Sequence, residues 1–189
     1  MKTSSKAKNT DDLEYILDHG IDVHGRKINI FSNITDDLSC RVITALQLMI
    51  KQSIDKPIDI YINSEGGEVY AGFAMYDYIK SLQNTEVNTH ILGTAMSMAT
   101  IIFLAGDNRY VYSESTLMLH SVSSMASGKV FLELEDETEQ CKRYYKRMCR
   151  IYEKYSTKPY SYWYNALKYK DKYLDAETAV RLKIADKIL

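Results

Sequence analysis

Short apolar runs alternate with longer amphipathic runs along much of the chain. Residues 26–31 indicate a strand, and residues 36–52 place apolar side chains three and four positions apart, which predicts an amphipathic helix. Pro57 opens the next strand, and residues 68–82 form a second helical pattern. This alternation predicts an α/β fold in which helices flank a parallel sheet.

The middle of the chain continues the pattern with shorter elements. Residues 87–92 predict a strand that ends at Gly93, and residues 98–105 predict a buried helix. Residues 108–112 and 116–119 add two more strands. The predicted strand and the buried helix are therefore joined by a short turn, which carries a hydroxyl side chain.

Residues 129–155 predict one long amphipathic helix, with acidic residues in its early turns and basic residues in its later turns. No linker rich in Pro, Gly or Ser and no internal repeat divides the sequence. Residues 13–189 are therefore expected to form a single domain behind a flexible arm, residues 1–12. The apolar face of the long helix consists of Cys141, Tyr145, Met148, Tyr152 and Tyr155.

Composition narrows the classes of function. The 189 residues carry a formal net charge of -1, which gives no global electrostatic reason to expect binding to nucleic acid or to an anionic membrane. No apolar run approaches the roughly 20 residues of a membrane helix, and the polar first residues do not resemble a secretory signal. Cys40, Cys141 and Cys149 have neither disulfide nor metal-ligand spacing, so reduced thiols in the cytoplasm and no metal site are expected.

The turn between the predicted strand and the buried helix has the sequence Gly93-Thr94-Ala95-Met96-Ser97-Met98-Ala99. A serine at this junction lies beside the free N–H groups and the positive dipole end of the helix. That position suits an alkoxide or an oxyanion, and it is also typical of an ordinary helix cap. The segment alone leaves both interpretations open.

Three other segments carry candidate chemistry. A strand within residues 60–69 ends at Gly66 and Gly67, whose uncovered N–H groups suit an oxyanion hole. His120 ends an apolar strand and can act as a general base toward a nearby hydroxyl. Asp171 can orient an imidazole. Each segment also has a plain structural interpretation: a strand–helix turn, a histidine at a sheet edge and a solvated charge.

Together and in this order, the segments resemble the Clp protease family, specifically its proteolytic subunits, from about residue 28 to residue 189. The resemblance implies a crotonase-like head of repeated strand–helix units, with a protruding handle helix in the region of residues 121–157. The matching segments are residues 62–67, 93–99, 118–120, 170–176 and 184–186.

The resemblance also implies roles for individual residues. In a serine endopeptidase of this family Ser97 would be the nucleophile, His120 the general base and acid, and Asp171 the orienting carboxylate. The backbone N–H groups of Gly67 and Met98 would form the oxyanion hole. Hydrolysis would pass through an acyl-enzyme, with no metal and no cofactor, and ATP would be used only by a separate AAA+ partner.

The family further implies an assembly of two stacked seven-membered rings, a tetradecamer, around a chamber that receives unfolded proteins. An AAA+ unfoldase would dock on the outer face, where Tyr61 keeps one expected aromatic residue and Asp59 replaces another. Residues 1–12 would line the axial pore. Handle helices would join the rings, and the candidate ring–ring contacts are Tyr144, Tyr145, Met148 and Tyr152.

Some positions depart from the family pattern. Glu65 and Val122 stand where the family usually has proline, and residues 123–128 replace a more glycine-rich stretch. These changes loosen the rim of the expected site without removing a catalytic group. Two other functions remain open: a catalytically silent subunit of a mixed ring, and an acyl-CoA enzyme of the crotonase type, which shares the fold and the oxyanion hole.

Overall fold

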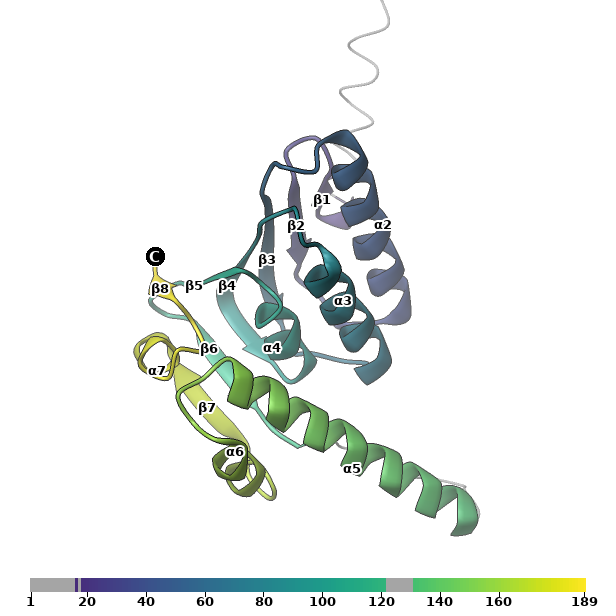
Figure 1. Ribbon diagram of the computed structural model, residues 1–189, viewed down its shortest axis with the longest axis vertical. Coiled ribbons are helices and arrows are strands. Elements are labelled where there is room, and N and C mark those ends of the chain that lie inside the picture. The colour runs from purple at the N-terminus through teal and green to yellow at the C-terminus, as the bar shows by residue number, and fades with distance from the viewer. Residues whose placement is uncertain (1–15, 17, 122–130) are drawn as a thin grey trace, which may run out of the picture.

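The computed structural model describes residue 16, residues 18–121 and residues 131–189 of the chain, with side chains in the last range described from residue 136 onward (Figure 1). In these ranges the strands are β1 (Ile21–Asp22), β2 (Lys27–Ile30), β3 (Ile58–Ser64), β4 (Val87–Met96), β5 (Asn108–Val111), β6 (Thr116–Leu119), β7 (Lys172–Asp175) and β8 (Lys187–Ile188). The helices are α2 (Asp36–Gln52), α3 (Val69–Ser81), α4 (Met98–Phe103), α5 (Phe131–Lys154), α6 (Tyr160–Ala166) and α7 (Ala176–Arg181).

The strands form one sheet, whose main path runs β1-β2-β3-β4-β5-β8. Every pairing on this path is parallel except the β1–β2 pairing, as expected for strands joined by helical crossovers. Helices α2, α3 and α4 lie beside one another along the sheet (Figure 1), and buried apolar side chains fill the space between these layers. The predicted α/β fold is confirmed.

Helix α2 has the bounds that its hydrophobic pattern predicts. Thr35 caps its first turn by accepting a hydrogen bond from the Leu38 amide at 3.2 Å, and Asp36 and Asp37 lie at the positive end of its dipole. Its apolar stripe, which includes Val42, is buried against the sheet. Local capping and burial thus favour the same helix.

Strand β4 does not end at Gly93, so that prediction is wrong. Gly93 has φ +79°, and the Thr94 amide donates to the Asn63 side-chain oxygen of β3 at 3.2 Å. The first half of β4 pairs with β5, and the second half, Thr94 to Met96, pairs with β6. Gly93 is therefore the point at which one strand bends and changes its partner, which requires a left-handed backbone that glycine adopts readily.

Helix α5 matches the predicted long helix, and its first turns extend away from the rest of the chain, as a handle would (Figure 1). Its later turns pack on the head. Met148 is 1% exposed and Tyr152 is 0% exposed, so neither is free to make the predicted ring–ring contacts. Tyr144 packs on Phe73, and Tyr145 donates to the Tyr164 carbonyl, so these two side chains also contact their own domain.

Short elements complete the fold. Strands β1, β7 and β8 and helix α6 have two to seven residues each and were not predicted. Helix α6 buries Trp163 against Tyr152 of α5, with ring centroids 5.5 Å apart. The predicted arm, Val122 and residues 123–128 lie outside the described residues. In the part of the chain that the structure describes, no helix has the length and apolar character to cross a membrane.

Candidate active site

Ser97 occupies a strained turn between β4 and α4. Its backbone has φ +53° and ψ −122°, a conformation that costs a non-glycine residue free energy and is often found at functional sites. The Ser97 amide donates to the Met118 carbonyl of β6 at 2.9 Å, which continues the β4–β6 ladder by one bond. The neighbouring strand therefore holds this turn in place.

His120 follows the last residue of β6, two positions beyond the carbonyl that binds Ser97. Its Nε2 atom lies 2.6 Å from Ser97 Oγ, and both side chains are half-buried. When Nδ1 carries the imidazole proton, the Ser97 hydroxyl donates to Nε2. Although Ser97 sits at the N-cap position of α4, its side chain makes no capping bond. The geometry thus favours a hydroxyl–imidazole pair over a helix cap.

The glycine turn after β3 lies directly against the Ser97 turn. A Cβ atom added to Gly66 would lie 2.7 Å from Ser97 Cβ and 3.1 Å from the Met98 nitrogen. A Cβ atom on Gly67 would lie 2.2 Å from the Ile34 carbonyl oxygen. Both glycines have positive φ, +98° and +149°. Only glycine fits this close approach of three backbone segments.

Two backbone N–H groups at this contact, those of Gly67 and Met98, are placed where they can bind an anion. Ile34 donates to the Gly66 carbonyl at 2.8 Å and accepts from the Glu68 amide at 2.9 Å, so the Gly67 N–H between them points away from Ile34. Met98 is the first residue of α4, where amides have no intrahelical partner. Among the described residues, neither amide has a hydrogen-bond acceptor. Both predicted oxyanion-hole donors are thus available next to Ser97.

Asp171 is placed near His120 but does not contact it. Strands β6 and β7 pair antiparallel up to Leu119 and Lys172, so His120 and Asp171 come one step beyond the end of the same ladder. Asp171 is exposed, and within the described ranges no hydrogen bond or ion pair joins its carboxylate to the imidazole. The structure brings together Ser97 and His120, and it leaves the third predicted member at the rim.

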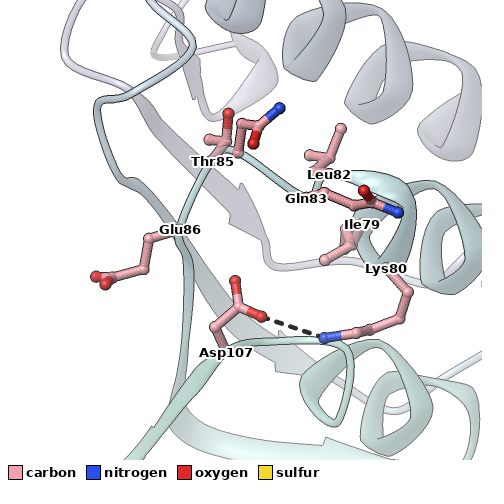
Figure 2. Close-up of a pocket in the computed structure, with 8 residues that line it drawn as sticks. Ile79, Lys80, Leu82, Gln83, Thr85, Glu86 and Asp107 are labelled. Carbon is pink, nitrogen blue, oxygen red and sulfur yellow. Dashed lines mark hydrogen bonds and ion pairs between the residues drawn. The ribbon is translucent and has the colours of Figure 1, made fainter.

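A polar pocket of about 440 Å³ lies at the other end of β4, between the end of α3 and the start of β5. There Lys80 binds Asp107 at 3.2 Å, whereas Glu86 points away from this pair (Figure 2). Asp107 also accepts from the Val87 amide at 2.9 Å. These bonds tie two loops to the amino ends of parallel strands, the end opposite to the one where such folds bind their ligands. The pocket has a structural explanation and is separate from Ser97.

The sequence did not indicate two residues that support the Ser97 turn. Thr100 Oγ1 donates to the Ser97 carbonyl at 2.6 Å and lies 3.1 Å from the Tyr152 hydroxyl of α5. Each residue places a hydroxyl among apolar residues of a predicted helix. Because buried polar groups need hydrogen-bond partners, this feature of the sequence could have identified both residues. The described residues contain no group of three or more His, Cys, Asp or Glu side chains arranged to hold a metal ion.

Comparison with known proteins gives a consistent result. A family model described as Clp protease matches residues 19–189. The ATP-dependent Clp protease proteolytic subunit of Dehalococcoides mccartyi is 31% identical over 166 residues, which cover 87% of this chain and 82% of the relative. A mutant ClpP1 from Listeria monocytogenes has a similar structure, with a TM-score of 0.79 and 26% sequence identity, over 88% of this chain and 92% of that chain.

Proposed function

This chain belongs to the Clp protease family, and from that premise we propose that it is a proteolytic subunit of the serine type with Ser97 as its nucleophile. One observation carries the proposal. Ser97 Oγ lies 2.6 Å from His120 Nε2 on a strained turn, beside two backbone amides that have no acceptor among the described residues. A base in contact with a hydroxyl is the arrangement that nucleophilic catalysis needs.

The first half of the reaction forms an acyl-enzyme. The Ser97 hydroxyl transfers its proton to His120 Nε2 as its oxygen bonds to the carbonyl carbon of the scissile peptide. The carbonyl oxygen becomes negatively charged and accepts hydrogen bonds from the Gly67 and Met98 amides. His120 then donates the proton to the amide nitrogen, the C–N bond breaks, and the amine product leaves an ester on Ser97.

The second half repeats these steps with water. His120 Nε2 takes a proton from the water as its oxygen attacks the ester carbon, and the same two amides bind the oxyanion. The proton then returns to Ser97 Oγ as the ester bond breaks. Asp171, once it reaches the Nδ1 side of His120, would stabilise the imidazolium that forms in both halves. The protein requires no metal or cofactor for these steps.

The assembly that we propose is two stacked seven-membered rings around a closed chamber, which admits unfolded proteins. A AAA+ unfoldase of the Clp type would use ATP and dock on the sheet face opposite the core. On that face the Tyr61 ring stacks on His90 at 4.5 Å, and Asp59 lies 3.2 Å from His90 Nε2. The docking surface is therefore more polar than the family pattern, and we expect the partner's contact to be adapted to it.

The cytoplasm is the compartment that we propose for this assembly. All three cysteines of the chain are described and unbridged, and Cys149 is buried, while Cys40 is exposed. An exposed free thiol fits a reducing compartment better than an oxidising one.

Hydrolysis of a short fluorogenic peptide by the purified assembled protein tests the function. We expect turnover without ATP, loss of turnover in Ser97→Ala, and an unchanged particle mass in that variant by native mass spectrometry. Turnover that survives in Ser97→Ala would overturn the assignment of the nucleophile. A particle mass that does not correspond to fourteen subunits would overturn the proposed assembly but leave the chemistry intact.

The exposed position of Asp171 favours a second candidate, a silent subunit of a mixed ring. In that case the pure protein would assemble but not cleave the peptide, and Ser97→Ala would change nothing. Mixing it with an active subunit would then be needed for turnover. The same assay therefore separates the two functions.

A further inference from the structure

A chain of three hydrogen-bonding groups connects helix α5 to the backbone of Ser97. Thr100 has one hydroxyl proton, which it donates to the Ser97 carbonyl at 2.6 Å. The 3.1 Å contact between Thr100 Oγ1 and Tyr152 must therefore be donated by the tyrosine O–H. Tyr152 is 0% exposed and Thr100 is 1% exposed, so water does not compete for these bonds.

Tyr152 stays a donor under all ordinary conditions. Burial raises its pKa well above the ordinary value, which keeps the hydroxyl protonated. Its ring is fixed between α5 and α6, where it contacts Trp163 with centroids 5.5 Å apart. The hydroxyl is consequently held at one position by packing, and removal of its partner would leave a buried polar group unsatisfied.

The carbonyl that receives these bonds belongs to the peptide unit between Ser97 and Met98. That unit is planar and trans, so its C=O and its N–H point in opposite directions and turn together. A bond that fixes the Ser97 carbonyl also fixes the direction of the Met98 N–H. Hydrogen bonds in such a row polarise one another, so a carbonyl that accepts a short bond makes the attached N–H a stronger donor.

We propose that Tyr152 is a positioning residue for hydrolysis, acting through Thr100 to aim and polarise the Met98 amide toward the oxyanion. This inference rests on the proposed function, since it assigns the Met98 amide to the oxyanion hole. The Thr100 amide also donates to the Ser97 carbonyl, at 3.1 Å, so the turn keeps one bond when the hydroxyls are removed. The relay therefore refines a geometry that the helix already provides.

The test is steady-state kinetics of the assembled protein on a short fluorogenic peptide. For Tyr152→Phe we expect kcat to fall about tenfold. This is less than the roughly 10²–10³-fold fall in kcat that follows complete loss of an oxyanion-hole donor. KM should change by less than about twofold, because the lost interaction acts only in the transition state. Thr100→Val should lower kcat by at least as much, and Thr100→Ser, which keeps the hydroxyl, should restore it.

A matched control is available on the same helix. The Tyr145 hydroxyl also donates to a backbone carbonyl, that of Tyr164, but this bond has no connection to Ser97. Tyr145→Phe should therefore lower stability without lowering kcat. In the double variant Tyr152→Phe/Thr100→Val, kcat should equal that of Thr100→Val alone, because both changes interrupt one row of bonds.

Several results would overturn the inference. These are a wild-type kcat in Tyr152→Phe, an equal loss in Tyr145→Phe, additive losses in the double variant, or a rise in KM with kcat unchanged. If Tyr152→Phe does not assemble, the Thr100→Val and Thr100→Ser pair decides in the same way. Failure of the proposed function has a different signature, since the wild-type protein itself would then not cleave the peptide or would not depend on Ser97.

Discussion

The two ends of the candidate proton relay differ in how firmly the chain holds them. Ser97 is half-buried, and its amide, carbonyl and hydroxyl bind Met118, Thr100 and His120. Asp171 is exposed, and the structure gives it no partner among the described residues. The proposed nucleophile is thus held in place by the fold of a single chain, and such preorganisation is the condition for strong electrostatic catalysis. Asp171, the proposed acid, is not held in place in this way.

Ser97 and Asp171 are held differently because the strands that carry them pair differently. Ser97 directly follows β4, an interior strand whose last residues pair with β3 on one side and with β6 on the other. Asp171 precedes β7, which among the described strands pairs with β6 alone, and the pairing stops before Asp171. One further β6–β7 pair would place the carboxylate across from His120. The fold of one chain thus brings the proposed nucleophile and base together, whereas the proposed triad needs one added pairing step at the sheet edge.

The largest expected effect comes from removing the base. His120→Gln should lower kcat on a short peptide by about 10⁶-fold, as loss of a single member of a Ser–His pair does elsewhere. His24→Gln is the control, since His24 is exposed in the β1–β2 turn. Near-normal turnover in His120→Gln would mean that the firmly held end of the relay is not the reacting one.

Removal of the Asp171 charge tests whether the loosely held end of the relay contributes to catalysis. Asp171→Asn should lower kcat by up to about 10⁴-fold with the assembly intact, because the imidazole loses its orienting charge. Glu177→Gln is the matched change on the same corner, since Glu177 is an exposed carboxylate in the first turn of α7. We expect no loss in that control. A mild effect of Asp171→Asn, measured by the same peptide assay, would assign the orienting role to a different acceptor.

The glycine turn provides an intermediate effect. Gly66→Ala would place a methyl group 2.7 Å from Ser97 Cβ and from the Met96 carbonyl oxygen, at a backbone φ of +98°. We expect kcat to fall about 10²-fold as the oxyanion site is displaced, together with a lower melting temperature. Gly25→Ala is the control, because the three atoms nearest to its added methyl group all belong to the Asp22 side chain, which can rotate away, and none belongs to the Ser97 turn. Full activity in Gly66→Ala would show that the turns are not tightly coupled.

The smallest expected effect is on stability, and it distinguishes Asp175 from its neighbour Asp171. Asp175 accepts from the Thr178 amide at 2.7 Å, and this bond lowers the pKa of Asp175 below its ordinary value of 3.8. Its stabilising effect is therefore fully present above pH 3.8 and is lost as the pH falls through the lower pKa of the folded state. Asp175→Ala should lower the melting temperature at pH 7 by about 2–4 °C, as a lost helix cap does.

Circular dichroism at a series of pH values checks this prediction. The difference in melting temperature between wild type and Asp175→Ala should shrink once the pH is below 3.8. Asp171→Ala should not lower the melting temperature at pH 7, because its carboxylate caps no helix. A loss of stability in Asp171→Ala equal to that in Asp175→Ala would contradict the proposal that Asp175 has a structural role and Asp171 a catalytic one.

The long elements could be predicted from the sequence because their signals are local. Helix α2 has a cap, an acidic first turn and an apolar stripe, and it begins and ends where the pattern says. The bend in β4 could not be predicted from periodicity, since its cause is a change of partner from β5 to β6. Strand β8 depends on the same kind of distant pairing, with β5, whereas β1 has only two residues and is too short for periodicity to detect.

Some residues of the candidate site could likewise be found from the sequence, whereas others needed the fold. Ser97, His120 and the two glycines were found from motifs, and resemblance to a family joined them, because no spacing along the chain indicates that residues 97 and 120 meet. The bond from Thr100 to Ser97 spans three residues, but its extension to Tyr152 spans 52 and needs the fold. The predicted use of Met148 and Tyr152 as ring contacts failed because an apolar helix face does not reveal which partner covers it.

Mass spectrometry of the assembled protein after treatment with a fluorophosphonate is the sharpest test of Ser97 as an activated nucleophile. These reagents react with a serine whose hydroxyl is activated by a base and whose adduct is stabilised by an oxyanion site. We expect one phosphonate adduct, located on Ser97, absent in Ser97→Ala and formed far more slowly in His120→Gln. An adduct on another serine, with Ser97 unmodified, would contradict it.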